Sequence, residues 1–283
     1  MLAEERRFRI TEILSRQRSV SAADLTAMLG VTAATIRRDL AELEQKGLLV
    51  RSHGGAVSKS STTSFQPSYE VQGTLNPEEK KRIAAEAARL VLDGETIFLE
   101  GSTTVAEIVP HLQAYKRLTV VTNSPLILFQ LYQFPGISVI ATGGELRHDI
   151  FYLSGVWTQR ALEEIRVDKA FMGISAVDPA YGISTASQAE ATIKQAITRS
   201  AKVRVGLADH SKFGKQGFAF VGPLTDLQVV VTDDRTPKDL LKEIGEAGVK
   251  VIVAGSAGAG QSHPKKQRRT GKPGASRSGG KLV

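Results

Sequence analysis

The sequence predicts an α/β protein, in which a parallel sheet covered by helices on both faces follows a small N-terminal helical unit. Short apolar or β-branched runs recur between residues 96 and 253, and helical patterns separate many of them, as is typical of a parallel sheet. Three helical patterns fill the first 45 residues, and a glycine turn separates the second from the third. A chain of 283 residues is long enough for two domains.

Composition divides the chain into four segments. Residues 1–57 are polar and helical in pattern, and we expect them to form one domain. Residues 58–77 are rich in Ser, Thr, Pro and Gln and are predicted to be a linker. Residues 78–254 form the second domain, and residues 255–283 are predicted to be a disordered basic tail because they contain almost no apolar side chains.

The net charge of +8 describes the tail more than the folded body. Residues 257–283 carry seven Lys and Arg residues and no acid, whereas residues 1–57 carry nine basic and seven acidic residues. An argument for nucleic-acid binding must therefore rest on where charges lie locally.

Several classes of protein and site are excluded or disfavoured. The chain has no cysteine, which excludes disulfides, thiolate metal sites and cysteine nucleophiles. No apolar run reaches the roughly 18 residues of a spanning helix, and the first residues do not resemble a secretory signal. We expect a cytoplasmic protein without a membrane partner, a metal or a cofactor.

The first two helices are predicted from their apolar positions and caps. The first is expected near Ala3–Gln17, and Ser21 is a suitable N-cap for the second. The expected apolar anchors are Leu2, Ile10, Ile13 and Leu14 in the first helix and Leu25, Met28 and Leu29 in the second.

The third helix is predicted to start after the turn Gly30-Val31-Thr32, with Thr32 as its cap, and to reach about Gln45. Ile36, Leu40 and Leu43 have the spacing of one buried stripe. The opposite, outward face then carries small residues and cations near the helix start, namely Ala34, Thr35, Arg37, Arg38 and Ala41. Small residues allow close approach to a DNA groove, and arginine binds guanine edges or phosphate, so this face is typical of a recognition helix.

A wing is predicted after the third helix. Residues 47–51 and 52–57 form two β-like runs around a turn, and Arg51 and His53 would lie along the DNA backbone or minor groove. The two cap residues Ser21 and Thr32 are also candidate DNA-binding residues. An arginine pair on a solvated helix face is the simpler interpretation of Arg37 and Arg38 alone. The capped turn, the small residues and the wing together favour DNA binding.

In the larger domain, seven strands and five helices are expected. The strands are Thr96–Leu99, Leu118–Thr122, Ser138–Thr142, Ala170–Ile174, Val203–Ala208, Val229–Thr232 and Val249–Val253. The helices are Glu78–Leu92, Thr103–Leu112, Pro125–Tyr132, Ala186–Ala201 and Pro237–Ala247.

Polar and glycine residues follow many of these strands, at the sheet edge where open parallel sheets bind ligands. The segment after the first strand, Glu100-Gly101-Ser102-Thr103-Thr104, indicates an anion cradle, although a hydroxyl N-cap after a glycine turn is the simpler interpretation. Further candidates at the ends of later strands are Thr122, Asn123, Gly143, Gly144, Gly173, Asp209 and Lys212. Lys212 would supply a cation for a phosphate, unless it is a solvated surface lysine.

Glu190 and Lys194 are four residues apart on a predicted helix. They form either a surface ion pair or a ligand site, in which the carboxylate accepts sugar hydroxyls and the ammonium meets phosphate. Their spacing alone does not decide between the two.

The chain resembles the DeoR family of bacterial transcription regulators over about residues 1–254. The resemblance rests on Val31–Leu40, His53-Gly54-Gly55-Ala56, Gly101–Thr104, Val121-Thr122-Asn123, Gly143–Leu146, Asp168–Gly173, Glu190–Lys194 and Ala208–Gly214. It implies a winged helix-turn-helix that binds operator DNA as a homodimer or homotetramer, usually as a repressor of carbohydrate metabolism. It also implies a sensor domain similar to ribose-5-phosphate isomerases, which binds a phosphorylated sugar. Glu100 stands where the family usually has Asp.

Two other functions stay open at this point. The first is a sugar-phosphate isomerase or deaminase with an added DNA-binding domain, for which Glu100, Glu190, Asp209, His210 and Lys212 are candidate acid–base residues. The second is a DNA-binding protein with a vestigial pocket. We expect no catalytic residues, because the resemblance is closer to the regulators than to the enzymes.

Overall fold

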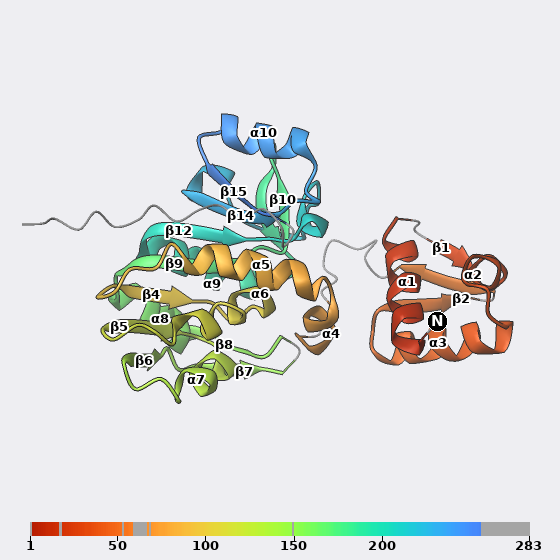
Figure 1. Cartoon of the computed structure of the whole chain (residues 1–283), viewed down its shortest axis with the longest axis horizontal. Helices are drawn as coiled ribbons and strands as arrows, with labels where there is room; N and C mark the ends of the chain where they lie inside the picture. Colours follow the sequence, from red (N-terminus) through yellow and green to blue (C-terminus); the bar gives the residue numbers. More distant parts are fainter. Residues whose placement is uncertain are drawn as a thin grey trace, which may run out of the picture.

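The computed structural model describes residues 2–16, 19–52, 54–58, 67, 69–148 and 150–255. His53, most of the predicted linker and the tail from residue 256 onward lie outside these residues. Figure 1 shows a small N-terminal unit, coloured red to orange, and a larger body that contains the rest of the described chain.

The N-terminal unit combines three helices with a small antiparallel sheet. Its elements are α1 (Ala3–Arg16), β1 (Ser19–Ser21), α2 (Ala22–Leu29), α3 (Ala33–Gln45), β2 (Leu49–Ser52) and β3 (Gly55–Ser58). The strands pair in the order β1-β3-β2, so the predicted two-stranded wing gains a third strand from before α2. At Gly55 a Cβ atom would lie 2.1 Å from the Val20 carbonyl oxygen, so the close pairing of β1 with β3 requires glycine there.

The predicted caps and buried stripe of the N-terminal unit are confirmed. The Ser21 hydroxyl accepts the Asp24 N–H, Gly30 ends α2 with a positive φ of 63°, and the Thr32 hydroxyl accepts the Thr35 N–H. Ile36, Leu40 and Leu43 are buried in a core that also contains Ile10, Leu14, Leu25 and Leu29.

Two of the predicted anchors are wrong, since Leu2 and Met28 are both exposed. Leu2 precedes the first turn of α1. In α2 the buried stripe consists of Leu25 and Leu29, four residues apart, so Met28 points away from it.

The larger body is built on a parallel sheet of seven strands, which confirms the predicted α/β class. The strands are β4 (Thr96–Leu99), β5 (Leu118–Thr122), β6 (Ile137–Ala141), β9 (Val167–Gly173), β12 (Ala201–Leu207), β14 (Val229–Asp233) and β15 (Lys250–Ala254). They lie in the order β6-β5-β4-β9-β12-β14-β15. The chain thus builds outward from β4 to β6 and then returns to build the other half from β9, which puts a topological switch point between β4 and β9.

Helices cover both faces of this sheet. One face packs against α5 (Pro77–Ala88), α6 (Thr103–Ala106), η2 (Val109–Leu112) and α7 (Pro125–Leu131). The other packs against α8 (Val156–Glu164), α9 (Gln188–Ser200) and α10 (Lys238–Glu246). The expected helix over Thr103–Leu112 is split into α6 and η2, because Pro110 cannot donate a backbone hydrogen bond within a continuous helix.

Some elements lie where no regular structure was predicted. The end of the predicted linker forms the short helix α4 (Tyr69–Thr74). A hairpin of β7 (Glu145–Arg147) and β8 (Tyr152–Ser154) precedes α8, and a small antiparallel sheet joins β10 (Ala176–Asp178), β11 (Gly182–Thr185) and β13 (Ala219–Gly222). The single-turn helices η3 (His210–Lys212) and η4 (Leu224–Asp226) follow β12 and β13.

Candidate functional site

The outward face of α3 carries the residues predicted to read DNA. Ala34, Arg37 and Arg38 are exposed near the start of the helix, and Thr35 is half-buried. Arg51 is exposed on β2, next to the end of α3, where its N–H donates to Glu44. These side chains form one basic surface on the helix and the strand that follows it.

Three of the predicted DNA-binding residues have local structural roles. Ser21 and Thr32 are the N-caps of α2 and α3, and the Thr35 hydroxyl lies 2.9 Å from that of Thr32. His53 lies outside the described residues. Contact of any of these residues with DNA stays a prediction.

An ion-pair cluster holds α3 against α1, and sequence reasoning missed it. Asp39 is buried one position after Arg38. Its carboxylate accepts hydrogen bonds from Arg6, at 3.1 Å from Nη2, and from Arg7, at 3.2 Å from Nε. Arg7 also pairs with Glu42. Asp39 therefore ties α3 to α1 directly behind the exposed arginines.

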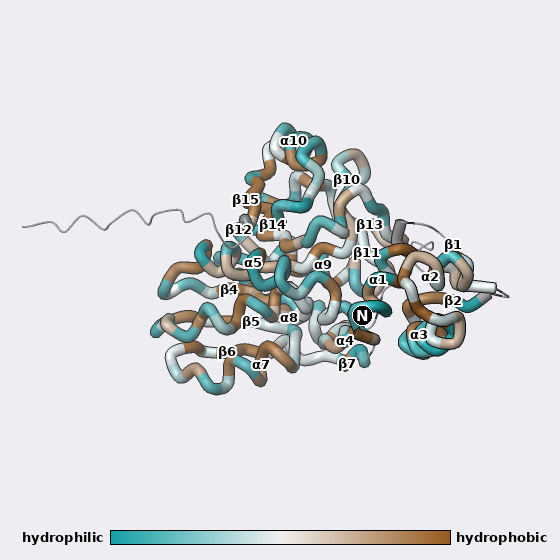
Figure 2. The backbone as a smooth tube through the Cα atoms, turned by 45° about the vertical axis from the view of Figure 1, so that its right-hand side comes forward, coloured by the Kyte–Doolittle hydropathy of each residue, from teal (hydrophilic) through white to brown (hydrophobic). Residues whose placement is uncertain are grey.

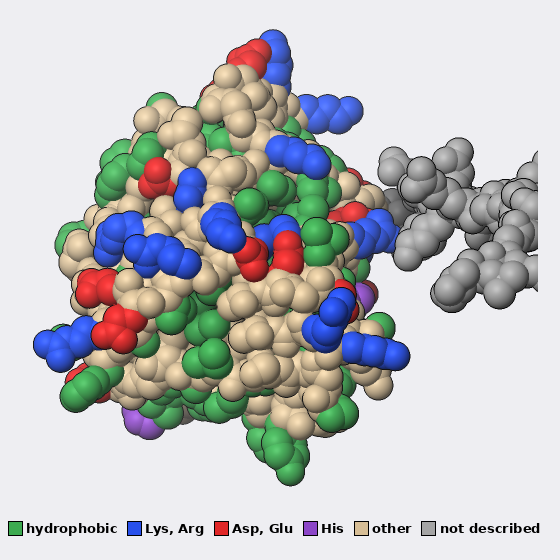
Figure 3. All heavy atoms as spheres, turned by 90° about the vertical axis from the view of Figure 1, so that its left-hand side faces the viewer, with side chains coloured by type: hydrophobic (Ala, Val, Ile, Leu, Met, Phe, Trp, Pro, Cys, Tyr) green, Lys and Arg blue, Asp and Glu red, His purple; other side chains and the backbone are tan. Residues whose placement is uncertain are grey.

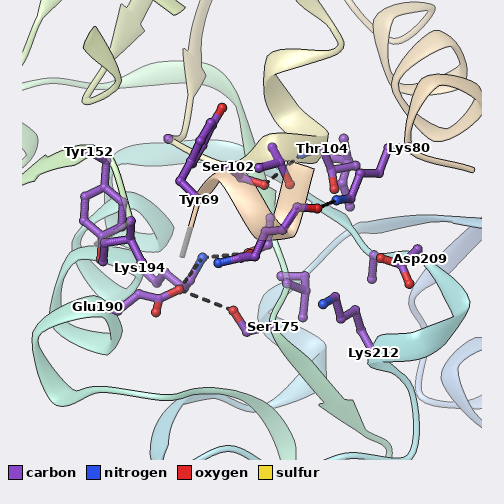
Figure 4. Close-up of a pocket in the computed structure, with 18 residues that line it drawn as sticks. Tyr69, Lys80, Ser102, Thr104, Tyr152, Ser175, Glu190, Lys194, Asp209 and Lys212 are labelled. Atoms are coloured by element: carbon purple, nitrogen blue, oxygen red, sulfur yellow. Dashed lines mark hydrogen bonds and ion pairs between the residues drawn. The ribbon is translucent and has the colours of Figure 1, made fainter. Parts of the chain in front are cut away.

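A pocket opens at the topological switch point of the large sheet. The loops after β4, β9 and β12 line it, together with α4, α5, α9 and the β7–β8 hairpin. Its lining residues are Tyr69, Gln72, Lys80, Gly101, Ser102, Thr103, Thr104, Ile150, Tyr152, Gly173, Ile174, Ser175, Glu190, Lys194, Leu207, Ala208, Asp209 and Lys212. Figure 4 shows how the labelled members of this set surround the pocket.

Lys194 is the centre of a buried charge cluster at the pocket floor. Its Nζ atom donates to Glu100 at 2.6 Å and to the Gly173 carbonyl at 2.6 Å, and lies 3.5 Å from Glu190. Burial lowers the pKa of Lys194, but the two carboxylates outweigh burial and raise it overall. Burial raises the pKa of the Glu100 carboxyl. Of the two interpretations of Glu190 and Lys194, the surface ion pair is therefore wrong, because both side chains are buried.

Glu190 presents an unsatisfied acceptor. Its Oε1 atom accepts a hydrogen bond from Ser175 at 3.3 Å. Its Oε2 atom is buried and has no hydrogen-bond partner among the described residues. A buried polar atom without a hydrogen-bond partner lowers the stability of the folded state. Glu190 Oε2 is therefore free to accept a hydrogen bond, for example from a hydroxyl group of a bound molecule.

Two further lysines lie on the other side of the pocket. Lys80 on α5 is buried and donates to the Gln72 carbonyl of α4, and Lys212 lies beside the carboxylate of Asp209. Burial, together with the charge of Lys212, lowers the pKa of Lys80 to about 8. Burial alone would raise the pKa of Asp209, but Lys212, Ser211 and Lys80 outweigh it and lower the pKa. Figure 4 shows Lys80 and Lys212 facing the pocket from two elements, opposite Glu190.

In the predicted anion cradle after β4, several backbone N–H groups already donate hydrogen bonds to other groups of the chain. The Gly101 N–H donates to Asn123, the Ser102 N–H to the Glu100 carbonyl, and the Thr104 N–H to the Ser102 hydroxyl. At Gly173 a Cβ atom would lie 2.2 Å from the Ser102 hydroxyl, so glycine lets the loops after β4 and β9 meet there. The cations of the pocket therefore have to supply most of the attraction for an anion.

The structure separates the predicted site residues into three groups. Nine line the pocket: Gly101, Ser102, Thr103, Thr104, Gly173, Glu190, Lys194, Asp209 and Lys212. Glu100, Thr122 and Asn123 are buried beneath it and hold its loops, for Asn123 also donates to the Leu153 carbonyl. Gly143 and Gly144 are exposed and do not line it.

Sequence reasoning missed the pocket residues that come from outside the strand ends. These are Tyr69 and Gln72 on α4, Lys80 on α5, Ile150 and Tyr152 near the hairpin, Ile174 and Ser175 after β9, and Leu207 and Ala208 at the end of β12. A lysine on a predicted amphipathic helix gives no signal that separates Lys80 from its neighbour Lys81.

Two kinds of site are absent from the described part of the chain. No group of three or more His, Asp or Glu side chains there could hold a metal ion. None of its helices combines the length and the apolar character that crossing a membrane requires.

Comparison with solved structures finds distant likenesses. The ribose 5-phosphate isomerase A of Methanocaldococcus jannaschii is 22% identical over 49% of this chain and 55% of that chain, with a TM-score of 0.36. The translation initiation factor eIF2B beta of Chaetomium thermophilum is 16% identical over 60% of this chain and 54% of that chain, with a TM-score of 0.42.

Comparison with families and curated proteins gives much stronger matches. A DeoR-like helix-turn-helix domain matches residues 6–62, and a DeoR C terminal sensor domain matches residues 75–234. A putative aga operon transcriptional repressor of Escherichia coli O157:H7 is 32% identical over 89% of this chain and 94% of its own length. The transcriptional regulator GlpR of Haloferax volcanii is 35% identical over 89% of this chain and 98% of its own length. The basic surface of α3 falls within the first matched domain, and the pocket, apart from Tyr69 and Gln72, falls within the second.

Proposed function

The chain belongs to the DeoR family of transcriptional regulators, and we propose that it represses an operon of carbohydrate metabolism until a phosphorylated sugar binds in the pocket. The observation that carries this proposal is the composition of the pocket, in which two lysines face an unsatisfied buried carboxylate oxygen. The name of the aga operon repressor, a relative over nearly its full length, supports repression.

The lysine side of the pocket suits a phosphate group. Lys80 and Lys212 repel each other, and this repulsion contributes to the low pKa of Lys80. A doubly charged anion between them would relieve the repulsion and accept charge-assisted hydrogen bonds from both. The hydroxyls of Ser102, Thr103 and Thr104 would add donors.

The opposite side of the pocket suits a sugar. Glu190 Oε2 would accept hydrogen bonds from one or two hydroxyls of the ligand, and the ion pair with Lys194 would hold the Glu190 side chain in place. Burial of both side chains makes this acceptor selective, since a ligand that lacks the hydroxyl leaves the oxygen unpaired.

The helix α4 would connect the pocket to the DNA-binding unit. It lies at the end of the segment between the two matched domains, and its Gln72 carbonyl accepts a hydrogen bond from Lys80. A ligand phosphate that binds Lys80 competes for this ammonium group and so shifts the position of α4. The change in operator affinity can then be no larger than the difference between the ligand's affinities for the two arrangements of the chain.

In the proposed repressor, α3 enters the major groove of the operator. Arg37 and Arg38 contact base edges or phosphates, Ala34 and Thr35 allow close approach, and Arg51 contacts the backbone. Two copies of the chain, as a homodimer or within a homotetramer, would occupy two half-sites about one helical turn apart or at a multiple of it. The protein would act in the cytoplasm, where it meets the DNA, and would need no cofactor.

We further propose that the pocket binds its ligand without converting it. Glu100, one of the candidate bases, is held by Lys194 and by the Gly173 N–H. His210 faces Asp233, at 3.1 Å from Nδ1, and does not line the pocket. An isomerase or deaminase activity would appear as turnover of ribose-5-phosphate or glucosamine-6-phosphate by the pure chain.

A thermal-shift screen with a panel of sugar phosphates tests the pocket. We expect one of them to raise the melting temperature of the wild-type chain, and the shift to disappear in the double variant Thr103→Ala, Lys212→Ala. Lys81→Ala is the matched control, because Lys81 is exposed on α5, next to Lys80, and pairs with Glu78 outside the pocket.

The loss of a charged hydrogen-bond donor costs about 1.5–3 kcal/mol, so Lys212→Ala alone should weaken binding roughly tenfold to hundredfold. A full thermal shift in the double variant, or an equal loss in Lys81→Ala, contradicts the assignment of the pocket. Turnover of a sugar phosphate contradicts the proposal of binding without catalysis.

A further inference from the structure

We propose that a second copy of this chain covers an apolar edge of the larger body, by pairing its own β6 with β6 of the first copy in antiparallel orientation. The apolar edge consists of Leu128 and Phe129 on α7, Tyr132 directly after it, Ile140 on β6, and Val156 and Trp157 at the start of α8. The proposal deepens the proposed function, because an operator-binding repressor of this kind acts as a pair.

The side chains of the apolar edge are unusually exposed for their size. Phe129 is 77% exposed, Tyr132 87% and Trp157 68%. Single exposed apolar residues are common on protein surfaces, but several large ones in one place mark an interface. Figure 2 shows the apolar stretch of α7 in brown, beside β6 at the lower end of the sheet.

The three elements meet at one end of the sheet. The helix α7 packs on β6, and β6 is the last strand at that end. The Thr158 hydroxyl of α8 donates to the Gly143 carbonyl at 2.7 Å, which fixes the start of α8 close to the end of β6. Figure 3 shows hydrophobic side chains along the lower rim of the molecule, where α7 and β6 lie in Figure 1.

The apolar edge lacks charge over an exceptional length of sequence. Residues 118–144 contain no Asp, Glu, Lys, Arg or His, although charged residues make up 23% of the chain. The opposite end of the sheet is built differently, since β15 begins with Lys250 and five of the nine residues of α10 are charged. Charged side chains normally protect an edge strand from pairing, and β6 has none.

The outer edge of β6 is a second reason to expect that another copy of the chain pairs there. Within the described residues, β6 pairs only with β5, so the backbone groups on its other side have no strand partner. Two identical strands related by a two-fold axis run antiparallel, and each supplies the donors and acceptors that the other lacks. An uncharged surface also suits a second uncharged copy of itself better than it suits a charged partner.

Neither the tail 256–283 nor residues 59–66 supplies a matching apolar segment for the apolar edge. The tail 256–283 contains only two large apolar residues, Leu282 and Val283, and starts after β15, at the opposite end of the sheet. Residues 59–66 are almost entirely polar, with Phe65 as the exception. A second copy brings a matching apolar edge of its own.

Sedimentation velocity of the full chain tests the inference. We expect wild type and Val253→Glu, a control on exposed β15, to sediment as dimers or larger at micromolar concentration. The dissociation constant of Phe129→Glu should be at least tenfold higher than that of the wild type, because the substitution buries a charge in the interface. Circular dichroism and the thermal shift with the sugar phosphate check that each variant is folded.

Cross-linking provides a second, independent readout, because the chain has no cysteine. A short bismaleimide should join two copies of Ser138→Cys or Ile140→Cys into a covalent dimer and leave Val253→Cys monomeric. The inference is overturned if Phe129→Glu keeps the wild-type mass, or if Val253→Cys cross-links as readily as the β6 variants. If such a result comes with intact operator binding and an intact thermal shift, the surface is wrong and the proposed function stands. If the wild type fails to bind any operator, the proposed function itself is wrong.

Discussion

At the scale of single residues, the two proposed functions depend on cations in different environments. Arg37 and Arg38 are exposed on α3, where they can reach a groove without disturbing the core. Lys80, Lys194 and Lys212 line a pocket, where burial and neighbouring charges shift the pKa values of Lys80 and Lys194. Exposed cations suit salt-dependent contact with DNA, whereas pocket cations suit selective binding of a small anion.

Substitution of Arg38 tests whether the outward face of α3, which we call the reading face, contacts the operator. Arg38→Ala should weaken operator binding by about 1–3 kcal/mol and leave the unfolding temperature unchanged, because the side chain is exposed. Lys46→Ala is the matched control, since Lys46 is a cation at the opposite end of α3. Fluorescence anisotropy with the operator measures both, and equal affinities of Arg38→Ala and the wild type remove Arg38 from the reading face.

The pKa of Lys80 makes ligand binding depend on pH. Lys80 binds a phosphate only when protonated, and its pKa of about 8 means that it loses its proton in the free pocket as the pH rises through 8. Ligand affinity should therefore be highest near pH 7, where a phosphate group is already doubly charged and Lys80 is still protonated, and fall severalfold or more by pH 9.

Lys80→Arg should abolish most of this decline, because arginine keeps its charge throughout this range. Isothermal titration calorimetry at a series of pH values measures the effect. An affinity that is constant from pH 7 to pH 9 in the wild type would show that Lys80 does not contact the ligand.

At the scale of elements, the helix caps, turns and buried stripes could be predicted from the sequence, because interactions between neighbouring residues determine them. The caps Ser21 and Thr32, the turn at Gly30 and the stripe Ile36–Leu40–Leu43 depend on residues within a few positions of one another, and each was predicted. The seven strands of the sheet were likewise predicted to within a few residues, because buried parallel strands are nearly continuous apolar runs.

Residues brought together by the tertiary fold could not be predicted in this way. Gly143 and Gly144 follow β6, which shares the carboxyl edge of the sheet with β4 but lies two strands away from the switch point. The order of strands, and not their polarity, decides which loops line the crevice. Lys80 enters the pocket from a helix, and Tyr69 enters from a segment that the composition marked as a linker.

The pairing of α1 with α3 makes a prediction at this scale. Asp39→Asn removes the ionised acceptor of Arg6 and Arg7, and we expect it to destabilise the N-terminal unit by about 2 kcal/mol, between the values typical of exposed and of fully buried ion pairs. Arg9→Ala is the control, because Arg9 pairs with Glu5 on the exposed side of α1. Urea denaturation followed by circular dichroism measures the difference, and equal stability of the two variants shows that this ion pair does not hold α3 in place.

At the scale of the whole molecule, the proposed function couples the basic surface of α3 to the pocket, which lie in different parts of the chain. The helix α4 is a described element within the segment between the two matched domains, and it forms part of the pocket wall. Coupling between two sites of this kind typically amounts to 1–3 kcal/mol, or roughly 5-fold to 150-fold in affinity. A regulator needs this coupling, whereas an enzyme or a protein with a vestigial pocket does not.

Operator affinity in the presence and absence of the sugar phosphate tests this coupling most directly. The operator is selected from random DNA by the chain itself, and the ligand is the sugar phosphate that most raises its melting temperature. We predict that, at the lowest ligand concentration that saturates the wild type, the ligand weakens operator binding at least fivefold in the wild type and in Lys81→Ala, and much less in Lys212→Ala, whose ligand affinity is lower. An operator affinity that the ligand leaves unchanged in the wild type, or changes equally in Lys212→Ala, would contradict the account.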